Sequence, residues 1–484
     1  MKVLLIEPAK FFAEESMNKI IKQTPHIGLA YLATVTKLMG HEVKVIDVPA
    51  VGCDIGWYVD FLKSWAPDFV GFSAMTHNIL EAYKFAHHTK AVNPDIRTVI
   101  GGPHANAVPI QTLEECDSLN IAVFGEGEIT FPELLDANKL SDVDGIAYRS
   151  GGKVVKNRPR APIMDLDDLP FPDWNLYNYE KDYAKAYSYK FKEMRHIYSI
   201  NTMRGCPFDC VFCSPHGLGP GARFRSAESI YTEIKINMDL HGATFFYLAD
   251  SNSTLKRSQI DGLCKMILDG GLDIAWKCET HVNAVDNILL TQMSLAGCEL
   301  IFYGIESGCT WIQKRIRKNL NLHRVRNIVR ETNEAGMKVR AGFIIGLPYE
   351  TKNTVQNTLD FARTLELEQA CFSLLDIYPG PEVEKMLERG EGGMSYLEGI
   401  KPRWDEVERA DVNVEVNDLK KIDLLRYYNE AYHIIHPKSL SSRMHKFLTE
   451  HRYYYENYPG ILLRHTQNNL AVIEAFIMTK EDSK

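Results

Sequence analysis

Short apolar runs alternate with amphipathic segments over the first 145 residues of the chain. Runs of this length that are rich in Val and Ile are typical of buried strands, and the segment at 29–40 has the periodicity of a helix. The alternation predicts an α/β domain with a doubly wound parallel sheet at residues 1–145. The runs are KVLLIEP (2–8), HEVKVIDV (41–48), PDFVGFSA (67–74), IRTVIGG (96–102) and IAVFGEGE (121–128).

A second alternation of strands and helices occupies residues 195–385. Six such units predict a partial (βα)6 barrel, in which the chemistry lies on the loops that follow the strands. Residues 146–194, with a short hairpin and several prolines, are expected to form a linker, and residues 386–484 a helical C-terminal region. The six candidate strands are HIYSINT, ATFFYLAD, LDIAWKCET, CELIFYGIES, MKVRAGFIIGLP and ACFSLLDIYP.

Composition narrows the classes of function without naming one. The net charge of −8 is spread along 484 residues without basic blocks, so nothing favours a nucleic-acid partner. The absence of a signal-peptide pattern and of any long apolar stretch predicts a cytoplasmic protein without a transmembrane segment. In a reducing compartment ten cysteines do not form a disulfide framework, so a tight group of them indicates a metal or redox site.

Three cysteines, Cys206, Cys210 and Cys213, lie close together on the loop that follows the first strand of the predicted barrel. Thiolates suit soft metals, and Gly205 helps this loop to bend around a metal centre. Two alternatives are three buried core cysteines and a structural zinc site completed by His216. The position at a strand end favours a working centre, because an iron–sulfur cluster on three thiolates keeps one iron free for a ligand.

The stretch CPFDCVFC (206–213) resembles the signature of the radical S-adenosylmethionine superfamily, C-x3-C-x-aromatic-C. The resemblance implies a 4Fe–4S cluster on Cys206, Cys210 and Cys213, with S-adenosylmethionine on the fourth iron. It further implies reductive cleavage of S-adenosylmethionine to a 5′-deoxyadenosyl radical and a reductant partner such as flavodoxin or ferredoxin. Phe212 supplies a flat apolar face for adenine.

Two later segments also resemble this superfamily. YGIESG (303–308) is similar to its fourth-strand stretch, and GFIIGLPYET (342–351) to its fifth-strand element. There are departures: LADSNST keeps Asp250 but places a serine after it, and KCETHVN offers His281 where an arginine is common. The residues that the resemblance implies for binding S-adenosylmethionine are Phe212, Asp250, Glu306, Ser307, Gly342 and Gly346.

Three loops of the N-terminal domain resemble the cobalamin-binding domain that is fused to one large class of these enzymes. The loops are VGFSAMT (70–76), GGPHA (101–105) and FGEGEIT (124–130). Glycines allow the backbone to approach a large ligand, and polar side chains supply hydrogen bonds. The alternative is a sheet that only covers the barrel. The candidate cobalamin residues are Ser73, Thr76, His77, Gly101, Gly102, His104, Gly125, Glu126 and Gly127.

The D-x-H-x-x-G motif that supplies a cobalt-ligating histidine in other cobalamin domains is not found after the first strand. The nearest histidine is His26 in TPHIGLAYLA (24–33), which has the wrong neighbours and spacing. We therefore expect His26 to begin a helix, and cobalamin to bind without a protein histidine on cobalt.

The sequence predicts a radical enzyme that transfers a methyl group to an unactivated carbon or phosphorus of a small molecule or biosynthetic intermediate. In that reaction one S-adenosylmethionine remethylates cobalamin and another makes the radical. The alternatives are a cobalamin-associated cyclase or oxidative rearrangement enzyme and, from a different class, a zinc-stabilised binding protein. No individual catalytic residue is assigned, and the region at 386–484 is where substrate choice is expected to lie.

Overall fold

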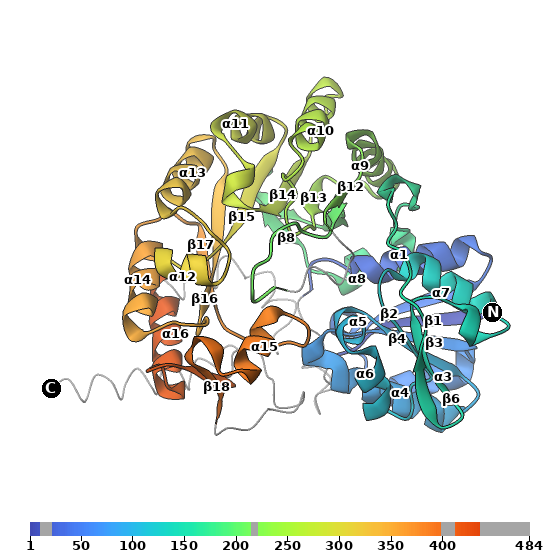
Figure 1. Cartoon of the computed structure of the whole chain (residues 1–484). Coiled ribbons are helices and arrows are strands. Elements are labelled where there is room, and N and C mark those ends of the chain that lie inside the picture. The colour runs from blue at the N-terminus through green and yellow to red at the C-terminus, as the bar shows by residue number, and fades with distance from the viewer. Residues whose placement is uncertain (10–21, 214–220, 398–411, 436–484) are drawn as a thin grey trace.

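The computed structural model describes residues 1–9, 22–213, 221–397 and 412–435, and it has two α/β lobes (Figure 1). The first lobe is built on a seven-stranded sheet with the order β2-β1-β3-β4-β5-β6-β7. The five apolar runs that open the chain all form strands of this sheet, and these strands are parallel. They are β1 (Lys2–Glu7), β2 (Glu42–Asp47), β3 (Phe69–Ser73), β4 (Arg97–Gly101) and β5 (Ile121–Val123).

Helices cover both faces of this sheet, which confirms the doubly wound expectation. Val3 and Leu5 of β1 pack in one core, and Leu4 and Ile6 pack in another. Successive side chains of a strand point to opposite faces, so an uninterrupted apolar run is buried on both. The first core is shared with α1 (Ile27–Leu38) and α7 (Gly127–Asp136), and the second with α3 (Ile55–Trp65), α4 (Ile79–Val92) and α6 (Pro109–Glu115). Short helices α2 (Val48–Val51) and α5 (Pro103–Ala107) follow β2 and β4.

The hairpin that the sequence analysis assigned to the linker belongs in space to the first sheet. Its strands β6 (Ile146–Ser150) and β7 (Lys153–Lys156) extend the sheet, and β6 pairs antiparallel with β5. The assignment missed this because a hairpin is recognised locally, whereas its pairing partner is not. The segment that follows has only short elements, namely η4 (Leu166–Asp168), η5 (Trp174–Leu176) and α8 (Tyr179–Asp182).

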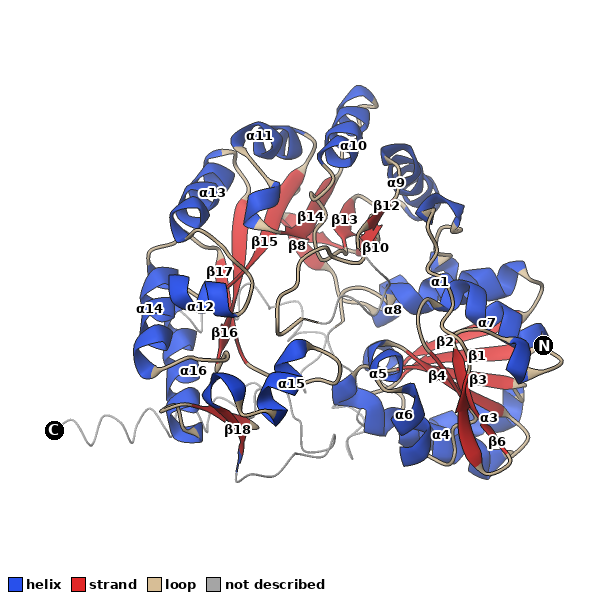
Figure 2. Ribbon diagram, in the orientation of Figure 1, coloured by secondary structure: helices blue, strands red, loops and turns tan. Residues whose placement is uncertain are grey.

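The second lobe contains six parallel strands with the order β10-β13-β14-β15-β16-β17, which confirms the partial barrel (Figure 2). Its strands are β10 (Ile197–Ile200), β13 (Phe245–Leu248), β14 (Ala275–Thr280), β15 (Cys298–Glu306), β16 (Lys338–Ile345) and β17 (Gln369–Leu374). Helices cover the outer face: α9 (Ala227–His241), α10 (Arg257–Asp269), α11 (Asn287–Leu295), α13 (Leu322–Glu334) and α14 (Lys352–Arg363). A hairpin of β8 (Ala186–Ser188) and β9 (Glu193–Arg195) precedes the first strand.

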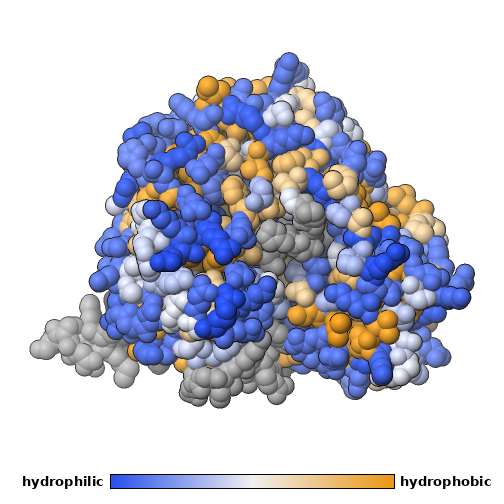
Figure 3. All heavy atoms as spheres, in the orientation of Figure 1, coloured by the Kyte–Doolittle hydropathy of each residue, from blue (hydrophilic) through white to orange (hydrophobic). Residues whose placement is uncertain are grey.

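The C-terminal region follows β17 and has more than the helices that the sequence predicted. It contains α15 (Glu382–Glu388) and α16 (Lys421–Ile435), and also an antiparallel pair, β18 (Met394–Tyr396) and β19 (Val414–Val416). Strands of three residues are too short to produce a periodic signal. No helix among the described residues is both long and apolar enough to cross a membrane. On the face drawn in Figure 3, hydrophilic residues cover most of the outer helices of this lobe.

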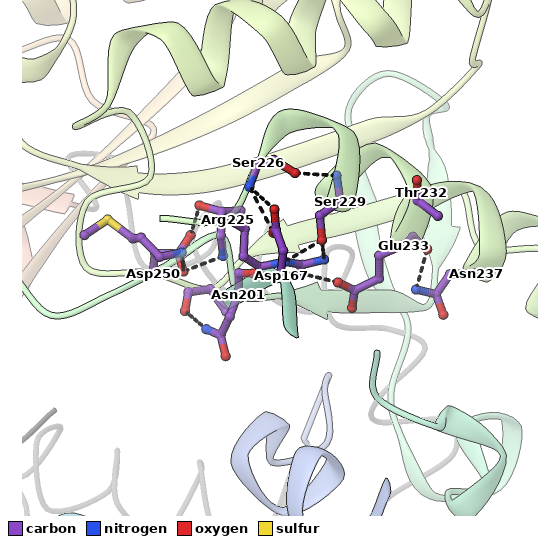
Figure 4. A network of polar contacts seen from close by, with 12 residues as sticks. Asp167, Asn201, Arg225, Ser226, Ser229, Thr232, Glu233, Asn237 and Asp250 are labelled. Atoms are coloured by element: carbon purple, nitrogen blue, oxygen red, sulfur yellow. Dashed lines mark hydrogen bonds and ion pairs between the residues drawn. The ribbon is translucent and has the colours of Figure 1, made fainter. Parts of the chain in front are cut away.

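A buried polar network braces the beginning of the barrel (Figure 4). Arg225 forms an ion pair with Glu233 of α9 and donates a hydrogen bond of 2.9 Å to the carbonyl oxygen of Asn201. The side chains of Arg225 and Glu233 are 3% and 0% exposed, so this pair is shielded from water. Asp167, from the segment between the lobes, accepts a hydrogen bond of 3.0 Å from the backbone of Ser226. The network therefore fixes both α9 and the connecting segment to the first strand.

A second set of buried charges joins the two lobes. Glu126, on the loop after β5, accepts hydrogen bonds of 2.8 Å from Arg204 and from Arg223, one on each carboxylate oxygen. These arginines lie opposite each other on β11 (Met203–Arg204) and β12 (Arg223–Phe224), the two short strands that flank the cysteine loop. Glu128 also pairs with Arg204. The exposed fractions of Glu126, Arg204 and Arg223 are 3%, 10% and 4%. We call this set, Glu126, Glu128, Arg204 and Arg223, the interlobe clamp.

The substitution Glu126→Gln tests the interlobe clamp. It leaves the buried guanidinium group of Arg223 without a carboxylate and Arg204 with Glu128 alone, which we expect to destabilise the protein by about 3–5 kcal/mol. Urea unfolding should show the loss, and limited proteolysis should cut the segment at 157–185 faster. The matched control is Glu133→Gln on α7, whose pair with Arg160 is partly exposed at 42% and 19%. That variant should lose at most about 1 kcal/mol, and equal losses for the two variants would contradict the clamp.

Candidate functional site

The three cysteines lie on the loop that leaves the carboxyl end of β10, as the sequence predicted. Cys206 is buried, Cys210 is half-buried and Cys213 is exposed. Gly205 has a φ of 81°, and a Cβ built on it would lie 2.1 Å from the carbonyl oxygen of Gly221. Only glycine therefore fits directly before Cys206.

Backbone hydrogen bonds attach the cysteine loop to the rest of the second lobe. The N–H of Val211 donates to Ile316 at 3.1 Å, and the carbonyl of Val211 accepts from Val383 at 2.8 Å. The N–H of Cys213 donates to the carbonyl of Cys210 at 3.1 Å, which makes the turn between these two thiols. The side-chain amide of Asn252 donates to the Cys206 sulfur at 3.5 Å. The loop is thus held at its middle, and its first thiol is oriented.

Within the described residues, no three His, Cys, Asp or Glu side chains already converge as a metal site, the three cysteines included. His216, the fourth ligand of the zinc alternative, lies outside the described residues. The donor set fits an iron–sulfur cluster nonetheless, because it offers three thiols on one irregular loop at a strand end. Burial raises the pKa of the half-buried Cys210 thiol. Bringing three thiolates together on one cluster requires a bound cation to balance their charge.

Lys318 is a residue of this site that sequence reasoning missed. Its ammonium lies 3.1 Å from a carboxylate oxygen of Glu306, and the two side chains are 12% and 13% exposed. Burial lowers the pKa of Lys318, but the charges of Glu306 and Cys210 outweigh burial and raise it above its ordinary value. A Cβ on Gly304 would lie 2.5 Å from Glu306 and 3.1 Å from Lys318, so this glycine leaves the room that the pair occupies. Lys318 belongs to no motif, and no signal in the sequence places it near the cysteines.

A cavity of about 460 Å³ adjoins the cysteine loop. Phe212 lies on its wall together with the ends of β16 and β17, and Tyr428 of α16 contributes a further side. Gly346, at the end of β16, has a φ of 90°. A Cβ on Gly342 would lie 2.9 Å from the ring of Phe302, so glycine is needed there for this ring to pack. The lining combines apolar side chains with polar ones such as Asp376 and Tyr378, a mixture that fits an adenosyl moiety beside Phe212.

Two other candidates for S-adenosylmethionine are already bonded within the protein. Asp250 accepts hydrogen bonds from the backbone N–H groups of Thr202 and Met203 at 2.9 and 3.2 Å, and from the Thr202 hydroxyl at 2.5 Å. Ser307 is 0% exposed, and its hydroxyl lies 3.1 Å from that of Thr358. The geometry thus shows Asp250 shaping the turn before the cysteine loop and Ser307 fastening β15 to α14.

The candidate cobalamin loops meet at the carboxyl edge of the first sheet. The N–H of Ala74 donates to the carbonyl of Gly101 at 3.0 Å. The Nδ1 atom of His104 lies 3.1 Å from the hydroxyl of Thr76. The hydroxyl of Ser73 lies 3.3 Å from the Nε2 atom of His26. His26 begins α1, where its Nδ1 accepts a hydrogen bond from the N–H of Leu29 at 3.2 Å. The expectation that His26 starts a helix is confirmed.

The remaining cobalamin candidates differ in the space around them. A Cβ on Gly102 would lie 2.7 Å from the carbonyl of Ala74, and one on Gly127 would lie 3.0 Å from Leu32, so these glycines serve close packing. Gly125 has a φ of 82°, nothing lies within 4 Å of its Cβ position, and His77 is exposed. The open space at Gly125 beside two bonded loops fits a large flat ligand. Glu126 differs from the expectation, because both of its carboxylate oxygens are taken by the interlobe clamp.

Comparison with known protein families agrees with this arrangement of two sites. Residues 17–135 match the B12 binding domain, and residues 200–362 match the Radical SAM superfamily. The family cofactors are accordingly cobalamin, a 4Fe–4S cluster and S-adenosylmethionine. The structure of the radical S-adenosylmethionine methyltransferase TsrM from Kitasatospora setae, with cobalamin and a 4Fe–4S cluster bound, has the same fold, with a TM-score of 0.67 at 18% identity over 83% of this chain and 81% of that chain.

Three relatives are similar along most of the chain. An uncharacterized methyltransferase of Pyrococcus horikoshii is 33% identical over 78% of this chain and 82% of its own length. The cytidylyl-2-hydroxyethylphosphonate methyltransferase of Streptomyces wedmorensis is 29% identical over 86% and 89%. The anaerobic magnesium-protoporphyrin IX monomethyl ester cyclase of Rubrivivax gelatinosus is 30% identical over 78% and 68%. The chain belongs to the family of radical S-adenosylmethionine enzymes that carry a B12-binding domain.

Proposed function

We propose that the protein transfers a methyl group to an unactivated carbon or phosphorus of a small molecule. The observation that carries this proposal is the interlobe clamp, because it attaches a cobalamin loop directly to both flanks of the cysteine loop. Two cofactors held this way are near one substrate, which favours transfer between them. Two similar relatives are named methyltransferases, and one relative is named a cyclase. Cyclisation or oxidative rearrangement is therefore the second candidate.

The roles of the residues follow from their places. Cys206, Cys210 and Cys213 bind the cluster, and Phe212 packs against the adenine of S-adenosylmethionine in the adjoining cavity. Glu306 accepts hydrogen bonds from polar groups of that cofactor, while Lys318 fixes its carboxylate in place. When bound, the cluster supplies the electron that cleaves S-adenosylmethionine, and cobalamin supplies the carrier of the methyl group.

The first lobe positions cobalamin by its backbone more than by its side chains. The loops after β3, β4 and β5 share one edge of the sheet, and the paired hydroxyl and ring of Thr76 and His104 hold two of them in register. His77 and the open backbone at Gly125 remain on the side where a corrin ring would lie. Gly101 and Gly102 allow the backbone after β4 to pass close beneath it.

The same proposal assigns a role to each region of the chain. Residues 1–145 bind cobalamin, 195–385 form the radical barrel, and 386–484 shape the substrate side. The segment at 146–194 connects them, with its hairpin added to the first sheet. A cytoplasmic reductant of the flavodoxin or ferredoxin type delivers the electron.

The triple variant Cys206→Ala, Cys210→Ala, Cys213→Ala tests the cluster. It should lose its iron and sulfide and release no 5′-deoxyadenosine with dithionite, because no other thiol lies on this loop. A matched control replaces Cys264, Cys278 and Cys298, which are buried in the same lobe, with alanine. The control should keep its iron. Release of 5′-deoxyadenosine by the first variant would refute the assignment.

The variant Glu306→Gln tests the proposed contact with S-adenosylmethionine. Loss of one charge-assisted hydrogen bond should weaken binding of S-adenosylmethionine by about tenfold, with iron content unchanged. Calorimetry on the reconstituted protein measures the affinity. Glu334→Gln, in an exposed pair on α13, is the control and should bind normally. If Glu306→Gln binds as the wild type does, Glu306 only holds Lys318.

Methyl transfer itself is tested with cobalamin and S-adenosylmethionine that carries an isotopic label in its methyl group. Incubation of the reconstituted protein with candidate lipids, tetrapyrroles and peptides should yield one labelled product, detected by mass spectrometry. A product without label would favour the cyclase or rearrangement reaction. A protein that binds no cobalamin would exclude the proposed mechanism.

A further inference from the structure

The inner face of the barrel is lined by charged side chains that the proposed function does not use. On β16 the residues Val339, Ala341 and Phe343 are buried in the core with the outer helices. The intervening residues of a strand point to the opposite face, so Arg340 projects into the barrel. The same alternation places Lys277 and Glu279 of β14 and Tyr247 of β13 on the inner face.

Two cations on this face make no hydrogen bond or ion pair with a described residue, although Glu279 and Glu299 lie close enough to act on the charge of Lys277. Within the described part of the chain, Arg340 makes no hydrogen bond or ion pair, and its Nε is buried. Lys277 also makes neither there, and its ammonium lies 4.9 Å from the centre of the Tyr247 ring. Buried cations are almost always paired, because an unpaired charge away from water is costly. An anionic ligand would give both cations a hydrogen-bonding partner.

The carboxylates nearby are bonded to other groups. Glu279 accepts a hydrogen bond of 2.6 Å from the hydroxyl of Tyr247. Glu299 accepts from the hydroxyl of Ser188 at 2.9 Å and from the backbone of Lys190 at 2.7 Å. Burial raises the pKa of both carboxyl groups, while the charge of Lys277 opposes this shift. Burial and the charge of Arg340 lower the pKa of Lys277 to about 8 although Glu279 and Glu299 act in the other direction, so an anion between the two cations would relieve their repulsion.

The position of these cations relates them to the radical site. Arg340 lies two residues before Gly342, and thus roughly 7 Å below it along the strand. Gly342 is the register partner of Gly304, which borders the Glu306–Lys318 pair. At the other end of the barrel, the bonds from Ser188 and Lys190 to Glu299 fasten the β8–β9 hairpin to the beginning of β15. A ligand on Arg340 therefore points its other end toward the cysteine loop.

We propose that the barrel interior binds the substrate by an anionic group, a carboxylate or a phosphoryl group, held between Arg340 and Lys277. This inference rests on the proposed function, because it concerns the substrate of the same site. The planar guanidinium of Arg340 matches two oxygens of such a group, and the ammonium of Lys277 binds a third position. The anion fixes one end of the substrate and leaves the carbon or phosphorus that reacts near the cluster.

The test uses the protein reconstituted with iron, sulfide, cobalamin and S-adenosylmethionine. Methylphosphonate is the probe, and its binding is followed by ³¹P line broadening, with acetate and the neutral analogue acetamide as competitors. The wild type should bind methylphosphonate, and acetate but not acetamide should displace it. Whichever of the two anions binds more tightly identifies the group.

Arg340→Gln and Lys277→Gln should each weaken methylphosphonate binding by about tenfold, and Arg340→Lys should weaken it less. Lys338→Gln is the matched control, because Lys338 is exposed on the same strand and pairs with Glu368. Its affinity should equal that of the wild type.

Three results would overturn the inference: a wild type that binds no methylphosphonate, variants at Arg340 and Lys277 that bind it normally, or an equal loss of affinity for S-adenosylmethionine in Arg340→Gln. The last result would show that Arg340 serves the cofactor. Because Arg340→Lys keeps the charge, it distinguishes a lost contact from a misfolded barrel. Release of 5′-deoxyadenosine by the wild type reports separately on the proposed function.

Discussion

The interlobe clamp is the interaction on which the arrangement of both sites depends. Its charges are almost completely removed from water, and such groups are tolerated only when each is paired and hydrogen-bonded. Glu126 meets this condition through both oxygens and through the backbone N–H of Ile163 at 2.6 Å. Because its partners flank the cysteine loop, the same contacts fix how far the candidate cobalamin loops lie from the three cysteines. Buried ion pairs add little net stability, so the main effect of the interlobe clamp is to fix the position of one lobe relative to the other.

The clamp also explains why the two α/β lobes act together although each has its own core. Their hydrophobic clusters are largely separate: one lobe packs around β1 and β3, and the other around β14 and β15. Ala30 and Ala50 of the first lobe also pack in the core of the second lobe, so apolar and directional polar contacts together define the angle between the lobes. The network at Arg225 adds a second fixed point through Asp167 of the connecting segment. Two separate polar attachments prevent a rotation that a single one would allow.

The sequence predicted features that depend on neighbouring residues, and it missed contacts between residues far apart in the chain. The parallel strands were found because they are buried on both faces, and the cysteine loop because its ligands lie in one short motif. Glu126 was taken for a cobalamin residue because the motif around it resembles such loops, whereas its partner Arg223 is 97 positions away. Lys318 and the unpaired Arg340 were missed for the same reason. Local spacing reveals neither a long-range ion pair nor the lack of one.

The barrel combines an apolar cavity near its mouth with unpaired cations deeper inside, and this order has a physical reason. Radical chemistry requires water to be excluded around Phe212 and the adenosyl group, which apolar walls achieve. An anionic anchor would disturb that environment if it lay in the cavity itself. Two residues further down the strand, Arg340 lies below Gly342, which leaves room for the ring of Phe302. The cations of the proposed anion site thus lie apart from the cavity beside Phe212, and one substrate extends from one to the other. Tyr428 of α16 lines the cavity, so the C-terminal region contributes to the shape of the cavity.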